Sequence, residues 1–187
     1  MDLEKSEVIS WIKTIVFAVV LSVGIRVFLF TPVSVEGASM MPTFENEEKV
    51  IVNIIGPALS DYNRFDVIVF KAPSGKNYIK RIIGLPGDRV EYHDDELFIN
   101  GEKFDEPYLE TNRAELLDSG DLTGDFTLQD TLGEEVVPEG HYFVLGDNRR
   151  YSSDSRDIRV GFVAQEKILG TVPVVVWPLP NARVIKD

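Results

Sequence analysis

Three short segments of this chain carry residues that together can perform acyl-transfer chemistry. The first is Gly37-Ala38-Ser39-Met40-Met41-Pro42-Thr43, in which Ser39 is flanked by small and apolar residues. A serine hydroxyl is a weak nucleophile until a general base takes its proton. If Ser39 is the nucleophile, another part of the chain must therefore supply that base.

Lysine fits that role better than histidine in this sequence. His93 falls at the expected tip of a hairpin and His141 at the start of an expected strand, and both positions favour a surface histidine. Lys80 instead lies in the apolar run Tyr78-Ile79-Lys80-Arg81-Ile82-Ile83. Burial among apolar groups lowers a lysine pKa from about 10.4 toward neutrality, because it penalises the charged ammonium. The neutral amine can then act as a general base.

The third segment is Gly146-Asp147-Asn148-Arg149-Arg150-Tyr151-Ser152-Ser153-Asp154-Ser155-Arg156, where Asp154 and Arg156 are able to pair. Each segment alone also fits an ordinary structural role. Ser39 fits a loop hydroxyl, Lys80 a strand lysine whose amine reaches solvent, and the third segment a polar turn. Their joint occurrence favours serine/lysine hydrolysis of peptide bonds at the outer face of a membrane.

An apolar run precedes these segments, from Trp11 to Phe30. Twenty helical residues span about 30 Å, one hydrocarbon thickness, and the two intruding charges, Lys13 and Arg26, lie near the ends. The run predicts a cytoplasmic tail at 1–10 and a transmembrane helix at 11–30. A cleaved signal peptide or a buried helix of a soluble domain are the alternatives. Flanking charges hardly distinguish the two orientations, so the chemistry that follows places the N-terminus inside.

The rest of the chain, residues 31–187, reads as a mostly β extracytoplasmic catalytic domain, built from an antiparallel sheet or a barrel-like arrangement. Asn100-Gly101 and the residues around His93 predict two hairpin turns. An acidic, weakly periodic stretch at about 102–139 predicts an inserted cap with a solvated face, and no EF-hand spacing supports calcium binding there. Short β-branched runs predict strands at 49–54, 66–70, 77–83, 89–92, 96–99, 141–145 and 171–177.

Composition excludes several other classes of function. A net charge of −12 argues against a nucleic-acid partner, because phosphate binding needs a basic face. The absence of cysteine removes disulfides, thiolate metal sites and cysteine nucleophiles. Two histidines without a His-Glu-x-x-His spacing give no basis for a metal centre. We therefore expect no cofactor and no metal.

With these residues laid out, the chain strongly resembles type I signal peptidases of the short, single-anchor kind found in Gram-positive bacteria. The resemblance covers nearly the whole chain, from the anchor to about Trp177. Four blocks carry it in the family's order and spacing, namely Ser39-Met40-Met41-Pro42-Thr43, Arg64-Phe65-Asp66-Val67-Ile68-Val69-Phe70, Lys80-Arg81-Ile82-Ile83-Gly84-Leu85-Pro86-Gly87-Asp88, and Gly146-Asp147-Asn148-Arg149 with Ser152, Asp154, Ser155 and Arg156.

The resemblance implies a role for each site residue. Ser39 would attack the scissile carbonyl with neutral Lys80 as general base, and the backbone N–H of Ser39 would hold the oxyanion. Ser152 would hydrogen-bond the lysine amine, while Asp154 and Arg156 would pair and brace the site. Some relatives, typically from Gram-negative bacteria, carry a serine two residues before the nucleophile as a second oxyanion donor. Here that position is Gly37, which has no side-chain donor, so the second donor is undetermined.

The resemblance also implies the partners. The substrates would be signal peptides of secretory preproteins with small residues at −1 and −3, bound in extended form against an enzyme edge at 33–36. Val33, Val35, Gly37 and Met40 are the substrate-binding candidates. The protein would be a single-pass protein of the cell membrane that meets its substrates in the lipid bilayer, and we expect a monomer. Phe44 and Trp177 are candidates for membrane contact or, equally, for buried packing.

Two competing interpretations share features with this one. A LexA-type serine/lysine self-cleaving repressor has related chemistry, but it requires a DNA-binding module, and the chain has no helix-turn-helix segment. A membrane-anchored β domain that binds or regulates without catalysis would keep the fold and need neither Ser39 nor Lys80.

Overall fold

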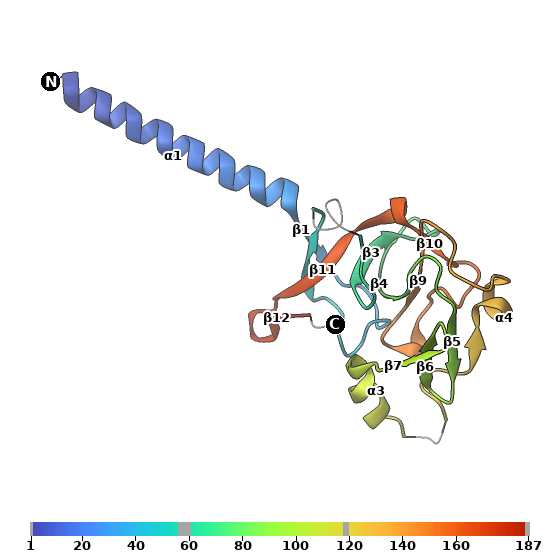
Figure 1. The fold of residues 1–187 in the computed structure, drawn as a ribbon. Coiled ribbons are helices and arrows are strands. Elements are labelled where there is room, and N and C mark those ends of the chain that lie inside the picture. Colours follow the sequence, from blue (N-terminus) through green and yellow to red (C-terminus); the bar gives the residue numbers. More distant parts are fainter. Residues whose placement is uncertain (1, 56–60, 118–119, 186–187) are drawn as a thin grey trace.

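The structure is a computed structural model that describes residues 2–55, 61–117 and 120–185. One continuous helix, α1 (Asp2–Leu29), extends away from a β-rich body, as Figure 1 shows. Several of its large apolar side chains are exposed, among them Trp11, Phe17 and Val20. Within the described part of the chain, no helix combines the length and apolar character needed to cross a membrane.

The larger of the two sheets is antiparallel and has eight strands: β1 (Phe30–Ser34), β2 (Lys49–Asn53), β3 (Val67–Lys71), β4 (Asn77–Gly84), β9 (His141–Leu145), β10 (Val163–Ala164), β11 (Ile168–Trp177) and β12 (Arg183–Val184). Its order is β1-β2-β11-β3-β4-β9-β10, with β12 paired to β11. The strands predicted for this sheet are present, and the last begins at Ile168 rather than at Thr171. Since β11 lies between β2 and β3, it joins β1 and β2, which flank the Ser39 segment in the sequence, to β3 and β4, of which β4 carries Lys80.

The smaller sheet has four strands in the order β7-β6-β5-β8 and lies beside the larger one in Figure 1. Both predicted hairpins are confirmed. Asp94 and Asp95 have φ angles of 51° and 65°, and Asn100 and Gly101 have 54° and 83°. Two consecutive positive φ angles are typical of the type I′ turn that joins twisted strands tightly. The strands are β5 (Val90–His93), β6 (Glu96–Ile99), β7 (Glu102–Phe104) and β8 (Phe126–Thr127).

The acidic cap differs from its prediction in two ways. Its strands β7 and β8 pair with β6 and β5, so the cap forms one sheet that begins at Val90 and not an insertion that begins at 102. Glu106 is also only 2% exposed, in contrast to the solvated face expected, because its carboxylate pairs with a buried arginine. The short helices are α3 (Glu110–Ala114), α4 (Leu128–Leu132), η1 (Pro107–Leu109), η2 (Arg149–Tyr151), η3 (Gln165–Lys167) and η4 (Leu179–Asn181).

The hydrophobic core beneath the nucleophile segment fixes that segment to the large sheet. Val35, Met40 and Phe44 are buried together with valines of β2, β3 and β11. Phe44 is fully buried, so packing rather than membrane contact describes its role, whereas Trp177 is 51% exposed. Because apolar side chains both before and after Ser39 enter this core, the backbone that carries the serine has little freedom to move.

Candidate active site

Ser39 and Lys80 meet in the folded chain. Ser39 lies in the turn after β1, Lys80 lies on β4, and the Nζ of Lys80 is 2.6 Å from the Oγ of Ser39. Lys80 is 2% exposed, while Ser39 keeps partial exposure to solvent. A base within hydrogen-bond reach of a solvent-accessible hydroxyl is the geometry that nucleophilic catalysis requires.

Burial lowers the pKa of Lys80 to about 8 from its ordinary value near 10.5, because desolvation penalises the ammonium. The negative charges of Asp154 and Asp147 oppose this shift without cancelling it. The amine also donates to the carbonyl of Ile79 at 3.0 Å and lies 5.4 Å from the ring centroid of Tyr78, on the same strand face. A substantial fraction of Lys80 is therefore neutral near physiological pH.

Two asparagines hold the backbone around the nucleophile. Asn148 donates its backbone N–H to the carbonyl of Ser39 at 3.1 Å and its Nδ2 to the carbonyl of Ala38 at 3.0 Å. Asn112, from the cap, donates its Nδ2 to the carbonyls of Met41 and Asp147 at 3.2 and 2.9 Å. The carbonyls on both sides of Ser39 are thus fixed by residues distant in the sequence.

The Ser39 backbone N–H, in contrast, donates no hydrogen bond within the described residues. It fits the predicted oxyanion donor, because an acceptor can approach it without breaking a bond inside the protein. Gly37, where a second donor was undetermined, has a φ of 90° and donates its N–H to the Oδ1 of Asn46 at 2.9 Å. Its N–H is therefore already engaged, and the second donor is not supplied by that group in this arrangement.

The opposite face of β4 carries a buried ion pair that sequence reasoning did not assign to the site. Arg81 and Asp147 are both fully buried and form two parallel hydrogen bonds of 3.0 and 2.8 Å. The guanidinium also lies 3.9 Å from the ring centroid of Tyr108, and Thr43 donates its hydroxyl to the Asp147 carboxylate at 2.5 Å. The ion pair of Arg81 and Asp147, with the hydrogen bond from Thr43, therefore links β4, the nucleophile segment and the segment that begins at Gly146. The only sequence signal for it was a second basic residue inside an apolar strand.

The predicted pair of Asp154 and Arg156 is present, with two hydrogen bonds of 2.9 Å. Asp154 also accepts from the backbone N–H of Gly146 at 3.1 Å, and Arg156 donates to the carbonyl of Arg149 at 2.6 Å. The pair therefore bridges the two ends of the loop between Gly146 and Arg156 and fixes its shape.

Ser152 does not make the bond to the lysine amine that the family resemblance implied. Its Oγ is buried and has no hydrogen-bond partner within the described residues. The hydroxyl lies against Gly146, where an added Cβ would come within 2.2 Å of the Ser152 Oγ and 2.4 Å of the Ser39 carbonyl. Packing in this narrow space places the hydroxyl beside the backbone of the nucleophile, and only glycine fits at position 146.

A second buried arginine links this loop to the cap. Arg149 donates to the Glu106 carboxylate at 2.5 Å, to the Tyr92 hydroxyl at 2.6 Å and to the Thr123 hydroxyl at 3.1 Å. It also bonds the carbonyl of Gly146 at 3.1 Å. Burial raises the pKa of Tyr92 well above its ordinary value, so the phenol stays protonated. The cap thus helps to position the loop between Gly146 and Arg156.

The predicted substrate-binding residues fall into two groups. Val35 and Met40 are buried in the core, at 4% and 2% exposure, so they can contribute only to the floor of a shallow pocket. Val33 is half-buried and Gly37 is exposed. Val33 lies on β1, which is an edge of the large sheet, and Gly37 follows the strand by three residues. This placement leaves an accessible strand edge directly before the nucleophile.

Comparison with known proteins decides the family. The sequence model of the family described as "Signal peptidase, peptidase S26" matches residues 8–177. The chain belongs to this family. Signal peptidase I of Bacillus caldolyticus is 49% identical over 161 residues, which cover 86% of this chain and 87% of the relative. Signal peptidase I of Bacillus amyloliquefaciens is 43% identical over 183 residues, 98% of this chain and 95% of the relative.

A solved structure supports the same assignment. The crystal structure of a signal peptidase I from Enterococcus faecalis V583 is similar, with a TM-score of 0.57 and 45% sequence identity over 60% of this chain and 97% of that chain. As a member of the signal peptidase family the protein is a serine peptidase, hence a hydrolase. The mostly antiparallel β architecture agrees with this membership.

Proposed function

We propose that this protein is a membrane-anchored serine endopeptidase that removes N-terminal signal peptides from secreted preproteins, cutting after small residues at −1 and −3. The observation that carries the proposal is the 2.6 Å contact between Ser39 Oγ and the buried amine of Lys80. Membership of the signal peptidase family, for which a Ser/Lys dyad is the mechanism, supports the substrate class.

In the first half of the reaction, neutral Lys80 takes the proton of the Ser39 hydroxyl as Oγ attacks the scissile carbonyl carbon. The carbonyl oxygen becomes an oxyanion and accepts a hydrogen bond from the Ser39 backbone N–H. When the C–N bond breaks, the Lys80 ammonium gives its proton to the leaving amine, which is the new N-terminus of the mature protein. The signal peptide remains as an ester on Ser39.

In the second half, a water molecule gives a proton to Lys80 and attacks the ester carbonyl. Collapse of that tetrahedral intermediate breaks the bond to Ser39 Oγ, which recovers its proton from Lys80. The signal peptide leaves with a new carboxyl terminus. Buried Lys80 thus moves one proton in each direction in both halves, and its pKa of about 8 suits both transfers.

Two unpaired backbone edges favour an extended substrate. β1 is the end strand of the large sheet and pairs only with β2 among the described strands. On β4, the pairing with β9 covers residues from Arg81 onward, so within the described part of the chain Asn77 to Lys80 pair with β3 on one side only. We propose that the signal peptide adds an extended strand at these two edges, β1 and residues 77–80 of β4. Its small −1 and −3 side chains then lie against Val33, Val35 and Met40.

The anchor is part of the same proposal. Residues 11–29 of the apolar run lie within α1, and Phe30 begins β1. The exposed apolar side chains of α1 occur at consecutive positions such as Ile15, Val16 and Phe17. A helix with apolar side chains all round is typical of a membrane environment. We place residues 1–10 in the cytoplasm and the catalytic domain outside, with a monomer in the lipid bilayer. Resistance of the full-length protein to extraction by alkaline carbonate, and protease access to its β domain from outside the cell, test this placement.

The activity is tested by cleavage of a signal-bearing preprotein in detergent by wild type, Ser39→Ala and Lys80→Ala. We expect cleavage after an Ala-x-Ala site by wild type alone, while all three proteins show the same thermal unfolding midpoint. Cleavage by Ser39→Ala at the wild-type rate contradicts the nucleophile assignment. A folded wild type that leaves several preproteins intact would instead favour a non-catalytic binding domain.

A further inference from the structure

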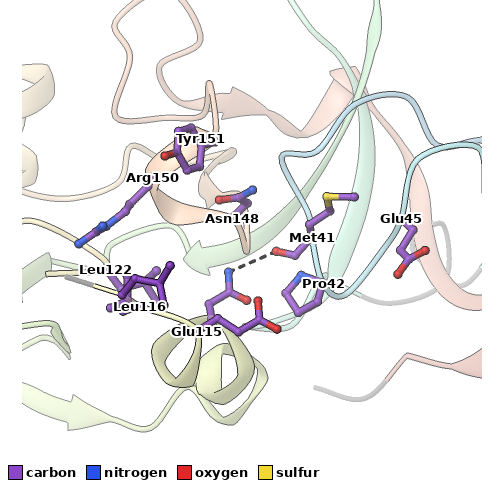
Figure 2. A pocket seen from close by; sticks show the side chains of 11 residues that line it. Met41, Pro42, Glu45, Glu115, Leu116, Leu122, Asn148, Arg150 and Tyr151 are labelled. Atoms are coloured by element: carbon purple, nitrogen blue, oxygen red, sulfur yellow. Dashed lines mark hydrogen bonds between the residues drawn. The ribbon is translucent and has the colours of Figure 1, made fainter. Parts of the chain in front are cut away.

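A groove of about 600 Å³ lies beside the nucleophile segment, between that segment, the cap and the loop after Gly146 (Figure 2). Its size falls within the range of about 300–1,000 Å³ that is typical of ligand-binding clefts. The proposed catalytic steps use none of its side chains. It is lined by Met41, Pro42, Glu45, Asn112, Glu115, Leu116, Leu117, Leu122, Asn148, Arg150 and Tyr151.

The groove is continuous with the proposed dyad through its two asparagines. Asn148 lines the groove and also holds the carbonyls of Ala38 and Ser39. Asn112 lines it from α3 and bonds the carbonyl of Met41, the contact drawn as a dashed line in Figure 2. The wall of the groove is therefore the same backbone that positions the nucleophile, and a chain bound there lies next to the scissile bond.

The strand edges proposed for the signal peptide contribute nothing to this groove. Its lining includes no residue of β1 or β4, and it begins at Met41, two positions after the nucleophile. A peptide that crosses the dyad enters along those edges and must continue past Ser39 over another surface. The groove supplies such a surface, formed by Met41–Pro42 on one side and by Asn148 and Tyr151 on another.

We propose that this groove binds the first residues of the mature protein, which follow the scissile bond, as an extended peptide with an apolar side chain. The inference rests on the proposed function, because it assigns the downstream half of the same substrate. Leu116 supplies apolar surface from the cap, Leu122 at 4% exposure contributes only to the floor, and Tyr151 projects into solvent with 79% exposure. Glu45, Glu115 and Arg150 are exposed at the groove, so its rim carries charges of both signs.

The groove also gives the cap a part in specificity. Glu115 and Leu116 follow α3, whereas Tyr151 ends η2 within the loop between Gly146 and Arg156. Apolar contact with a substrate side chain is worth roughly tenfold in kcat/KM, since a methylene-scale difference in a hydrophobic pocket gives about 10-fold to 200-fold. Selection downstream of the cut would therefore be moderate and would add to the requirement for small residues upstream.

The test uses two preproteins with the same signal peptide, the same cleavage site and the same residue at +1. One carries apolar residues at +2 to +5, and the other carries alternating Gly and Ser there. The readout is the ratio of kcat/KM for the apolar preprotein to that for the Gly/Ser preprotein. It is measured for full-length wild type, Leu116→Ser/Tyr151→Ser, and the control Ile158→Ser, which changes an apolar side chain with 79% exposure outside the groove.

We expect a ratio of about 10 for wild type and for Ile158→Ser, and a ratio near 1 for Leu116→Ser/Tyr151→Ser. A wild-type ratio near 1, or a groove variant that slows both preproteins equally, overturns the inference while the proposed function stands. Absence of cleavage of either preprotein by wild type overturns the proposed function, and the inference fails with it. Thermal unfolding midpoints of the three proteins confirm that the variants are folded.

Discussion

Lys80 and Arg81 are consecutive buried cations on β4, and the protein treats them in opposite ways. Arg81 is fully buried but meets the Asp147 carboxylate with two hydrogen bonds, so its charge is compensated. Lys80 is buried against Ser39 and a backbone carbonyl, with no carboxylate at ion-pair distance among the described residues. Its pKa consequently falls to about 8. Burial alone therefore does not turn a cationic side chain into a base. The pKa of Lys80 falls because its amine is buried without a counter-ion.

The largest expected effect separates the two residues by function. Lys80→Met should lower kcat/KM for a preprotein by about 10⁴-fold or more, because Ser39 loses its base. Lys80→Arg should be as inactive, since a guanidinium does not deprotonate. Lys80→Met should unfold at or above the wild-type temperature, because a desolvated amine is removed, whereas Lys80→Arg should unfold at a lower temperature, because its guanidinium stays charged in a buried site without a counter-ion. An active Lys80→Arg protein would show that the amine is not the base.

The next largest effect distinguishes Arg81 from Lys80 by its contribution to the free energy of unfolding. Arg81→Met should lower the free energy of unfolding by about 3–5 kcal/mol, because the Asp147 carboxylate is left buried and unpaired. Urea unfolding followed by circular dichroism measures this loss. The double variant Arg81→Met/Asp147→Leu removes both charges and should recover much of it. Equal losses in the single and double variants would mean that the pair is not the source of the stability.

The pH dependence tests the state of Lys80 directly. Since the neutral amine is the active form, kcat/KM should rise as pH increases through the pKa of about 8 and level off above it. One pH unit below the pKa, the rate should be about tenfold below the plateau. A profile that still climbs at pH 10 without an inflection would contradict a desolvated base.

The smallest effect concerns Asp154, whose carboxylate opposes the lowering of the Lys80 pKa. The charge of Asp154 raises the pKa of Lys80, so Asp154→Asn should move the inflection of the pH profile below 8. Asp157→Asn is a matched control, because Asp157 pairs with exposed Arg159 instead. The control profile should coincide with that of wild type. A shift to higher pH in Asp154→Asn would reverse the assigned sign of this interaction.

Local sequence patterns predicted the parts of the site but not their assembly. The apolar run around Lys80 and the Asn100-Gly101 turn are local signals, because strand burial and turn geometry depend on adjacent residues. The bonds from Asn148 and Asn112 to the nucleophile segment depend on the packing of distant strands, which no short pattern encodes. The same holds for the side chain of Ser152, whose direction is set by the space at Gly146. The cap boundary was misplaced because acidic composition concealed strands that pair with β5 and β6.

The position of β11 in the sheet also determines when the sheet can be completed during synthesis of the chain. Ser39 follows β1 and Lys80 lies on β4. Among the described strands, β1-β2 and β3-β4 are joined in the sheet through β11, which spans Ile168–Trp177. A growing chain therefore exposes its serine and its lysine long before the strand that connects them has been synthesised. The sheet that positions Ser39 relative to Lys80 is consequently complete only after β11 has been synthesised and has paired with β2 and β3.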